Sequence, residues 1–235
     1  MTFHIPRLNR IKAWRQGLAR QAFRRELKQL ALSLEKPFFV KVGAHDGLTG
    51  DPCTEFLLAN ARWQGLLIEP VPAFAEKLKE RFGNRGRFTI LQMAVGETEG
   101  TAAFYYVLKE AEGKVPNLPD WYDQISSFDV GHIEKHLGDE IRPFIGTLQV
   151  AVKPLGNILD ELNIQVVDLL QVDTEGHDLA VLESLYFNRH KPRVIFVEHK
   201  HLAAPKKQVL LQLLADNGYK VSDCGGDFYA KLRHS

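Results

Sequence analysis

The stretch Phe38–Gly47 constrains the fold most, because a continuous apolar run there ends in a turn bracketed by two glycines. Phe38–Val42 combines β-branched and aromatic residues, which is typical of a buried parallel strand. Gly43 and Gly47 follow where a strand turns sharply into a helix while a ligand approaches bare backbone. Residues 54–61 then have helical composition. Strand, glycine turn and helix together predict the start of a nucleotide-binding βαβ unit.

A carboxylate follows at the end of the next apolar run, Gly65–Glu69. This spacing places Glu69 at the tip of the second strand, roughly 20–25 residues past the glycine turn, where ribose hydroxyls are usually held. The alternative is an ordinary loop with a solvent-facing glutamate. We expect a ligand site at this edge of the sheet.

The bulk properties define the class of protein but not its ligand. The length of 235 residues suits one substantial core, and the formal net charge of +1 gives no global argument for nucleic acid. Cys53 and Cys224 lie far apart and form no CxxC or metal spacing, which favours a reduced, cytoplasmic setting. No apolar run reaches membrane-spanning length, and the N-terminus lacks the apolar core of a signal peptide.

Residues 1–36 differ from the rest because they combine helical apolar spacing with many basic residues. The apolar positions at this spacing are Ile5, Leu8, Ile11, Trp14 and Leu18, followed by Ala22, Phe23, Leu27, Leu30 and Leu34. One or two basic amphipathic helices of this kind can lie on an anionic membrane or on a phosphate-rich partner. We expect instead that the segment packs on the following domain through Ile11, Trp14 and Leu18, without stable membrane anchoring.

From residue 37 to residue 235, short apolar strands alternate with helical segments. The expected strands are Phe38–Val42, Leu66–Glu69, Phe88–Ala94, Ala102–Val107, Thr147–Val152, Val166–Asp173, Val194–His199, Tyr219–Asp223 and Phe228–Leu232. The expected helices are Pro72–Phe82, Leu155–Leu162, Leu179–Leu185 and Lys206–Asn217. This alternation predicts an α/β fold with a mostly parallel sheet of seven strands, helices on both faces and an antiparallel last strand from a late hairpin.

The alternation lapses over Leu108–Gly146, which is long, rich in proline, glycine and charge, and weakly periodic. A compact domain rarely keeps such an insertion without a use, often as a lid or substrate cap. We expect it to fold over the carboxyl edge of the sheet. We expect four side chains of the insertion to face a polar, ring-shaped substrate: Trp121, Tyr122, Ser126 and Ser127. The alternative is a surface excursion packed by its own aromatic residues.

Four motifs together resemble one protein family. VGAHDG (Val42–Gly47), LLIEPVP (Leu66–Pro72), LLQVDTEGHD (Leu169–Asp178) and VEHK (Val197–Lys200) closely resemble, in order and spacing, the FkbM family of S-adenosylmethionine-dependent methyltransferases. LPDWYDQISSF (Leu118–Phe128) is similar to a segment of one branch of the family. The resemblance implies a Rossmann-like class I methyltransferase fold over Phe38 to about Leu232. Many relatives methylate hydroxyl groups of sugars or other natural products, so we expect O-methylation of a carbohydrate-like small molecule.

The expected cofactor is therefore S-adenosylmethionine, lying over the glycine turn with its ribose on Glu69. The residues expected to hold it are Gly43, Ala44, His45, Asp46, Gly47, Glu69, Pro70, Met93, Ala94 and Asp173. One departure concerns Lys41, because class I methyltransferases usually carry an acid at this position, two residues before the first glycine. Asp46 or Asp173 can serve the cationic methionine end instead, or Lys41 can contact the methionine carboxylate.

Methyl transfer from a sulfonium is an in-line displacement in which alignment supplies about 7–11 kcal/mol and a base removes the acceptor's proton. We expect Asp173 and His199 near the reacting methyl group, because both follow strands at the carboxyl edge. Around the acceptor we expect Glu175, His177 and Glu198. Strand-end acids can also simply cap the next helix. These groups permit a divalent metal that would acidify a hydroxyl, but no ligand spacing indicates one, so a metal is not favoured.

Two other classes of function remain open. A nicotinamide-dependent oxidoreductase would use the same glycine turn and Glu69, although the turn lacks the middle glycine and full spacing of GxGxxG. A catalytically silent module that only binds S-adenosylmethionine would explain Lys41. The sequence indicates neither the identity of the acceptor nor the oligomeric state.

Overall fold

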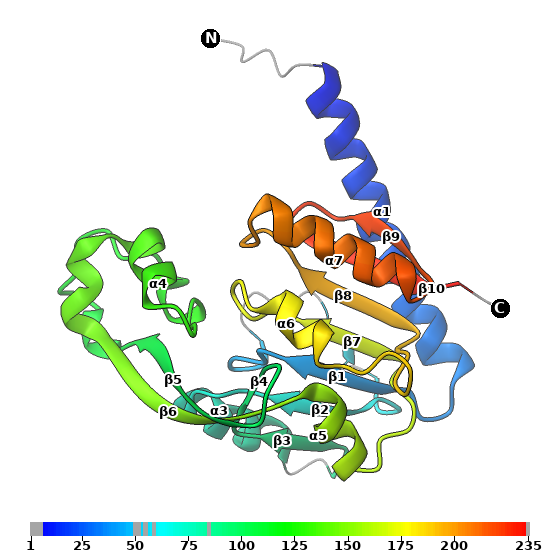
Figure 1. Cartoon of the computed structure of the whole chain (residues 1–235), viewed down its shortest axis with the longest axis horizontal. Helices are drawn as coiled ribbons and strands as arrows, with labels where there is room; N and C mark the ends of the chain where they lie inside the picture. Colours follow the sequence, from blue (N-terminus) through cyan, green and yellow to red (C-terminus); the bar gives the residue numbers. More distant parts are fainter. Residues whose placement is uncertain (1–6, 49–52, 54–55, 58–59, 84–85, 234–235) are drawn as a thin grey trace.

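Seven strands form the central sheet of the computed structural model, which describes residues 7–48, 53, 56–57, 60–83 and 86–233 (Figure 1). In spatial order they are β3 (Phe88–Leu91), β2 (Gln64–Ile68), β1 (Phe38–Val42), β7 (Leu169–Val172), β8 (Val194–Glu198), β10 (Asp227–Leu232) and β9 (Tyr219–Asp223). β10 runs antiparallel to β8 and β9, while the pairings among β3, β2, β1, β7 and β8 are parallel. The predicted Rossmann-like class I methyltransferase fold is therefore confirmed.

The apolar strands bury both faces of this sheet, because successive side chains point to opposite sides. Val40 and Val42 belong to one core cluster, whereas Phe39 and Leu67 belong to the other. The first cluster lies under α5 (Leu155–Glu161), α6 (Asp178–Glu183) and α7 (Ala204–Asp216), and the second under α1 (Arg7–Ser33) and α3 (Pro72–Phe82). About half of the predicted helix over 54–61 lies outside the described residues. Within this range, Phe56 and Leu57 are helical.

Helix α1 lies on the sheet through a different stripe from the predicted one. Phe23 is buried and stacks on Phe196 with ring centroids 4.3 Å apart, and Arg20 Nε donates to the Cys224 carbonyl oxygen at 2.7 Å. The buried stripe of α1 is Ala19, Phe23, Leu27, Leu30 and Ala31. Trp14 is 64% exposed, so the predicted contact through Trp14 and Leu18 is wrong.

The reason is the position of the helix. Its N-terminal part projects beyond the sheet (Figure 1), so contact with the sheet begins only near Ala19. The side chain of Ile11, also predicted to pack here, lies outside the described residues. Among the described helices, none combines the length and the apolar character that crossing a membrane requires.

A second sheet, which the sequence did not predict, consists of β4 (Ala94–Val95), β6 (Ile145–Lys153) and β5 (Gly100–Val107). The predicted third strand, Phe88–Ala94, is divided, since β3 ends at Leu91 and Ala94 begins β4. β5 and β6 form a long antiparallel pair that carries the insertion at its far end (Figure 1).

The insertion between β5 and β6 has its own small core. Its elements are η2 (Lys109–Ala111), η3 (Tyr122–Gln124), α4 (Val130–Leu137) and η4 (Asp139–Phe144). Its buried residues are Val107, Ala111, Val115, Tyr122, Ile125, Ile133 and Ile141. We call residues 108–144 the insertion lobe; it stands at one side of the main sheet (Figure 1).

Candidate functional site

A cavity with about 540 Å³ of empty space, part of it open to solvent, lies at the carboxyl edge of the main sheet, between the strand ends and the insertion lobe. Its lining residues are Val42, Gly43, His45, Ile68, Glu69, Pro70, Met93, Ala94, Val95, Phe104, Gln124, Ser126, Phe128, Asp173, Thr174, Glu175 and His177. This cavity brings together ten of the residues predicted for the site: seven for the cofactor and three for the acceptor.

The two glycines of the turn are required by neighbouring protein groups. Gly43 has a φ of 76°, and a Cβ atom built on it would lie 1.8 Å from the carbonyl oxygen of Asp173. Gly47 has a φ of 75°, and its Cβ would meet the side chains of Phe82 and Leu78 at 2.6 and 2.7 Å. Both positions therefore need glycine. Only Gly43 lines the cavity, so close approach of a ligand is not the reason for Gly47.

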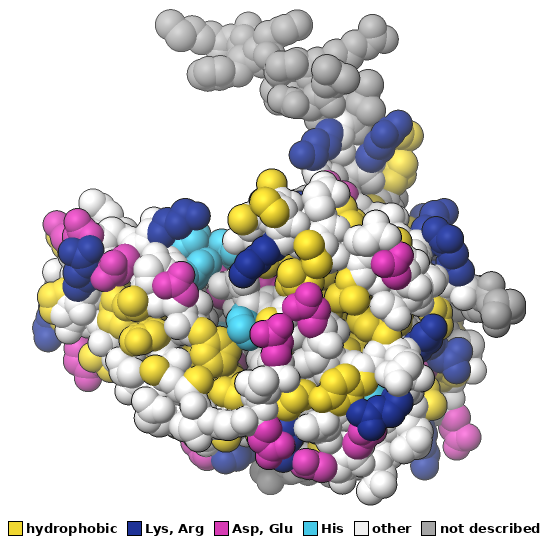
Figure 2. Space-filling view, viewed as in Figure 1, with side chains coloured by type: hydrophobic (Ala, Val, Ile, Leu, Met, Phe, Trp, Pro, Cys, Tyr) yellow, Lys and Arg dark blue, Asp and Glu magenta, His cyan; other side chains and the backbone are white. Residues whose placement is uncertain are grey.

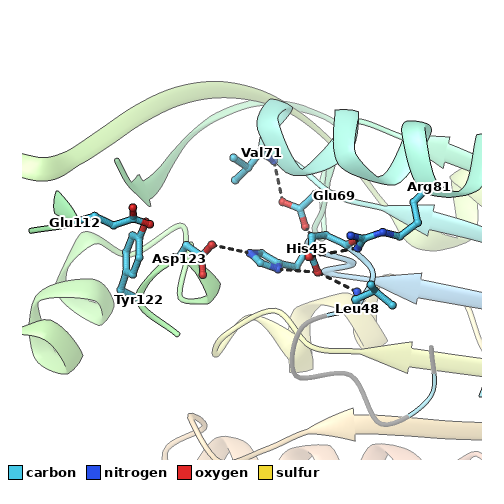
Figure 3. Close-up of polar contacts among 9 residues, drawn as sticks. His45, Leu48, Glu69, Val71, Arg81, Glu112, Tyr122 and Asp123 are labelled. Atoms are coloured by element: carbon cyan, nitrogen blue, oxygen red, sulfur yellow. Dashed lines mark hydrogen bonds and ion pairs between the residues drawn. The ribbon is translucent and has the colours of Figure 1, made fainter. Parts of the chain in front are cut away.

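The residues between these glycines point in different directions. The ring of His45 lines the cavity, packs on Phe74 with centroids 3.8 Å apart, and places Nε2 3.7 Å from Asp123 Oδ2 of η3 (Figure 3). Burial lowers the pKa of His45, which keeps the ring neutral near pH 7. Ala44 is buried in the core instead.

Asp46 is held within the turn. Its Oδ1 accepts from the backbone N–H of Leu48 at 2.9 Å, and its Oδ2 lies 3.4 Å from Arg81 Nη1. Of the five turn residues predicted to touch the cofactor, Gly43 and His45 line the cavity, whereas Ala44, Asp46 and Gly47 support the turn from outside it.

Glu69 follows β2 and lines the cavity in a nearly buried position. Its Oε2 accepts from the backbone N–H of His45 at 2.8 Å, and its Oε1 accepts from the backbone N–H of Val71 at 2.9 Å (Figure 3). Burial raises the pKa of Glu69 to about 7, although these two backbone donors oppose the shift. A single carboxylate is thus fixed at the second strand tip, as the spacing predicts.

The next part of the wall is apolar. Pro70, Met93 and Ala94, which were predicted cofactor residues, line the cavity beside Val95 and Phe104. Val95 belongs to β4 and Phe104 to β5, so the second sheet supplies part of this wall. The surface suits a flat, weakly polar group.

The loop after β7 contributes Asp173, Thr174, Glu175 and His177 to the cavity. The Asp178 carboxylate holds the backbone of this loop. Its Oδ1 accepts from the Thr174 N–H at 3.0 Å, and its Oδ2 accepts from the Gly176 N–H at 3.1 Å. Burial, together with the nearby Asp173, raises the pKa of Asp178 to about 7.

Two titratable side chains of this loop differ in charge. Burial lowers the pKa of His177, whose ring lies 4.7 Å from that of Phe128, so it is neutral near pH 7. Burial alone would raise the pKa of Glu175, but contacts with the imidazoles of His132 and His201 lower it to about 2. Glu175 therefore stays ionised and is a weak base.

The structure contradicts the predicted position of His199 near the reacting group. Its buried ring packs on Phe228 with centroids 3.8 Å apart, and its Nε2 lies 3.6 Å from Asp223 Oδ1, on the hairpin side of the sheet. Glu198 does not line the cavity either. It lines a neighbouring cavity beside α1, where its carboxylate contacts Lys200. Neither residue lines the cavity, because His199 packs against the β9–β10 hairpin and Glu198 faces the neighbouring cavity.

The insertion lobe reaches the cavity through residues other than most of those predicted. Ser126 lines the cavity as predicted, together with Gln124 and Phe128. Trp121 is 43% exposed and does not line it. Ser127 is buried, with its backbone bonded to Tyr105 and its Oγ accepting from the Asp129 N–H at 3.2 Å.

Tyr122 also does not face the cavity, because it belongs to the lobe's own core. Its hydroxyl donates to Glu112 Oε1 at 2.8 Å, away from His45 (Figure 3). The predicted positions of Trp121, Tyr122 and Ser127 are therefore wrong. Apolar character alone did not reveal which aromatic residues form the lobe's core and which face a ligand.

Comparison with known proteins identifies the family. The family model described as Methyltransferase FkbM domain matches residues 41–221. The chain belongs to the FkbM methyltransferase family.

Individual relatives of this FkbM chain are distant. The 2-O-methyltransferase NoeI of Sinorhizobium fredii (strain NBRC 101917 / NGR234) is 22% identical over 192 residues, covering 80% of this chain and 74% of NoeI. The crystal structure of methyltransferase FkbM from Methylobacillus flagellatus KT is 15% identical with a TM-score of 0.49, covering 83% of this chain but only 44% of that one. Fibrillarin from Aeropyrum pernix, solved with natively bound S-adenosyl-L-methionine, is 10% identical with a TM-score of 0.43, covering 83% of this chain and 66% of that one.

Lys41 of this FkbM domain occupies the position where class I methyltransferases usually carry an acid. It is buried in β1 and shares the α1-facing side with Phe39, since Val40 and Val42 point to the opposite face. Lys41 is not among the cavity-lining residues, although its charge acts on Glu69. The expected contact between Lys41 and a methionine carboxylate stays a prediction.

Sequence reasoning missed several lining residues of the FkbM site. These are Val42, Ile68, Val95, Phe104, Gln124, Phe128 and Thr174. Three of them are close in sequence to residues that were predicted for the site: Thr174 adjoins Asp173, and Gln124 and Phe128 flank the predicted serines. Their positions could therefore have been inferred from these neighbours. Phe104 had no such neighbour, because Ala102–Val107 was expected as an exposed strand or a hairpin arm.

Proposed function

We propose that this chain transfers a methyl group from S-adenosylmethionine to a hydroxyl group of a carbohydrate-like small molecule. The observation that carries the proposal is the cavity, because strand-end residues such as Glu69 and Asp173 share it with Ser126 and Gln124 of the insertion lobe. The name of the relative NoeI, a 2-O-methyltransferase, supports oxygen as the acceptor atom.

Unsatisfied polar atoms in the cavity wall fit a polar ligand. Within the described residues, Thr174 Oγ1 and Ser126 Oγ are buried without a hydrogen-bond partner, and the ring nitrogens of His45 have only long contacts, with Asp46 at 3.5 Å and Asp123 at 3.7 Å. Buried polar groups almost always have hydrogen-bond partners in native proteins. A bound ligand with hydroxyl, amine or carboxylate groups would supply partners for these atoms.

We assign the sheet-edge half of the cavity to the cofactor. Each carboxylate oxygen of Glu69 already accepts one backbone N–H and keeps lone pairs for the two ribose hydroxyls. Met93 and Ala94 would cover the adenine, and the Asp173 carboxylate would face the cationic methionine end. When bound, S-adenosylmethionine supplies a sulfonium methyl group, whose carbon–sulfur bond breaks as a carbon–oxygen bond to the acceptor forms.

We assign removal of the acceptor's proton to an imidazole nitrogen of His177. This side chain lines the cavity and is neutral near pH 7, so it can accept a proton, whereas Glu175 is too weak a base. Ser126 and Gln124 would orient the acceptor by hydrogen bonds, and Phe128 would cover one face of a sugar ring. His177→Asn should lower the rate of methyl transfer about 100-fold or more while retaining affinity for S-adenosylhomocysteine.

The proposal is tested first by binding and then by turnover. Calorimetry with S-adenosylhomocysteine and with NAD should give saturable binding for the first compound only. A panel of free sugars, glycosides and nucleotide sugars is then incubated with S-adenosyl-[methyl-13C]methionine, and the product is read as an O-methyl signal by NMR.

Each outcome has a clear meaning. Binding of NAD in place of S-adenosylhomocysteine would support the oxidoreductase alternative. Binding of S-adenosylhomocysteine with an N-methyl or C-methyl product would overturn the assignment of oxygen as acceptor. Binding without turnover on any member of the panel would support the catalytically silent module.

A further inference from the structure

Three histidines from two distant parts of the chain meet beside the cavity. His132 and His136 are one helical turn apart and so share a face of α4, while His201 follows β8. Their ring centroids are 4.4 Å (His132–His136), 4.8 Å (His132–His201) and 4.9 Å (His136–His201) apart. One ligand nitrogen from each ring lies within 4.8 Å of the others. Figure 2 shows histidine side chains gathered where the insertion lobe meets the rest of the molecule.

The Glu175 carboxylate contacts two of these rings, and with Glu198 and His201 it forms a second group whose potential ligand atoms lie within 4.8 Å of one another. Glu175 Oε2 lies 2.9 Å from His201 Nε2 and 3.4 Å from His132 Nε2. These separations are close to the roughly 3.3 Å between two ligands of a tetrahedral ion with bonds of about 2.0–2.1 Å. The side chain of Glu175 is nine-tenths buried, and among the described residues Glu175 Oε2 and His132 Nε2 have no hydrogen bond of acceptable geometry.

The groups around the cluster orient its ligands. His136 Nδ1 lies 2.8 Å from the backbone carbonyl oxygen of His132, so Nδ1 carries the proton and Nε2 keeps its lone pair. Metal-ligating histidines usually donate their other ring N–H to a carbonyl or carboxylate oxygen in this way. Glu198, which is almost fully buried, places Oε2 3.9 Å from His201 Nε2, while its Oε1 contacts Lys200.

We propose that His132, His136, His201 and Glu175 bind one divalent first-row transition metal of the Zn²⁺ class. Imidazole nitrogens and one carboxylate oxygen are the ligand set that such ions prefer, whereas Mg²⁺ and Ca²⁺ prefer oxygen ligands. A simple ion-pair network around Glu175 would need only His132 and His201. It gives no role to the third ring, which the structure holds in the same group.

The site would join three segments that carry the cavity. Two of its ligands belong to α4 in the insertion lobe, and the others follow β7 and β8 at the edge of the main sheet. Because Glu175 also lines the cavity, the ion would hold the lobe against the sheet edge next to the acceptor. Any effect of the ion on methyl transfer rests on the proposed function, whereas binding of the ion does not.

The test uses the full chain without an affinity tag, stripped with EDTA and desalted. Titration with Co²⁺ should produce visible d–d absorption bands that saturate at one ion per chain, and Zn²⁺ should abolish these bands by displacement. Mg²⁺ at the same concentrations should not compete. Zn²⁺ should also raise the melting temperature, because it binds only the folded state.

Two ligand variants and one control make the result specific. His136→Gln and His201→Ala should each lower Zn²⁺ affinity at least tenfold, and circular dichroism checks that they fold. His190→Gln is the control, because His190 contacts Asp160 at 2.8 Å in another part of the chain, and it should bind Zn²⁺ like the wild type. If His201→Ala fails to fold, His136→Gln, on the partly exposed face of α4, still decides the question.

The proposal fails if the wild type shows no saturable Co²⁺ or Zn²⁺ binding, or if folded His136→Gln binds as tightly as the wild type. These outcomes differ from failure of the proposed function. Stoichiometric metal binding without methyl transfer to any acceptor would leave the site standing. Turnover without metal binding would remove the site and leave the methyltransferase assignment intact.

Discussion

The sheet-edge half of the cavity is fixed by backbone groups, whereas the half contributed by the insertion lobe is made by side chains. On the sheet side, the Glu69 carboxylate is held by the N–H groups of His45 and Val71, and Gly43 is tightly apposed to the Asp173 carbonyl. On the lobe side, Ser126 Oγ has no partner among the described residues. The position of the Glu69 carboxylate is therefore set by the protein backbone, whereas Ser126 Oγ, like Thr174 Oγ1 at the sheet edge, still lacks a hydrogen-bond partner among the described residues.

The two halves also belong to different cores. The sheet-edge loops continue strands of the main core, while the lobe closes over its own cluster around Tyr122 and Ile133. Side-chain contacts such as His45–Asp123 and His132–Glu175 join the halves. This difference predicts that changes on the sheet side affect folding and cofactor binding, whereas changes on the lobe side affect the acceptor.

The largest effect is expected from Gly43→Ala. The new Cβ would overlap the Asp173 carbonyl oxygen, and φ is 76°, so β1 and β7 must shift apart. We expect a loss of at least about 3 kcal/mol of unfolding free energy, measured by urea denaturation. Gly100→Ala is the matched control, since a Cβ there meets nothing within 4 Å. Equal stability of the two variants would contradict the backbone-defined sheet-edge half.

Glu69→Ala should weaken binding of S-adenosylhomocysteine by about 1.5–3 kcal/mol, because hydrogen bonds to a charged acceptor are lost. The variant also frees the N–H groups of His45 and Val71, so its fold is checked by circular dichroism. Calorimetry at pH 8 gives the affinity. A folded variant with unchanged affinity would place the ribose elsewhere.

The pKa of Glu69, raised to about 7 by burial, gives a pH signature. The unfolded chain releases this proton near pH 4.5, so the stability contributed by protonated Glu69 is present below that pH and is lost as pH rises through 7. Cofactor affinity should change in the opposite direction, rising about tenfold from pH 6 to pH 8 as the carboxylate forms.

The comparison that isolates this residue is Glu69→Gln. It should flatten both pH dependences relative to the wild type, measured by denaturation and by calorimetry with S-adenosylhomocysteine. Asp178, whose pKa is also raised to about 7, remains in both proteins and cancels from the difference. Identical pH curves for wild type and variant would show that Glu69 is not the group responsible.

The same contrast explains what could be predicted from the sequence. Strand periodicity and the glycine turn located β1, β2 and Glu69, because these features depend on local spacing and on the position of strand ends. The mostly parallel sheet and its antiparallel last strand, β10, were predicted from the same alternation and the late hairpin. All of these belong to the backbone-defined half.

The lobe and the strand-end histidines were less predictable, because their positions depend on tertiary packing. Trp121 and Tyr122 look alike in sequence, yet one is exposed and the other buried in the lobe's core. His199 and His201 both follow β8, but only His201 turns toward the lobe, where it meets His132. No spacing rule links residues 132 and 201, so their meeting was visible only in three dimensions.

A smaller effect, confined to the acceptor, is expected from Ser126→Ala. Its hydroxyl lines the cavity without a partner among the described residues, so its removal costs the fold little and should cost one hydrogen bond to the acceptor. We expect a loss of about 1 kcal/mol, a roughly fivefold fall in kcat/KM, with unchanged affinity for S-adenosylhomocysteine. Ser127→Ala, whose hydroxyl bonds within the lobe, tests whether the effect belongs to the cavity. A greater loss of kcat/KM in Ser127→Ala than in Ser126→Ala would show that Ser127, and not Ser126, faces the acceptor.

The smallest effect is expected from Asp123→Asn, which alters a direct contact between the two halves. Asp123 Oδ2 lies 3.7 Å from His45 Nε2, but burial lowers the pKa of His45, so at pH 7.5 the contact joins a carboxylate to a neutral ring. Such a contact contributes about 0.5 kcal/mol or less, and the side chain of Asp123 is partly exposed, which weakens it further. We therefore expect unfolding free energy and cofactor affinity within error of the wild type, with at most a twofold rise in the KM of the acceptor. A tenfold loss of cofactor affinity would show that the lobe helps to hold the cofactor, and the division between a backbone-defined cofactor half and a side-chain-defined acceptor half would then be wrong.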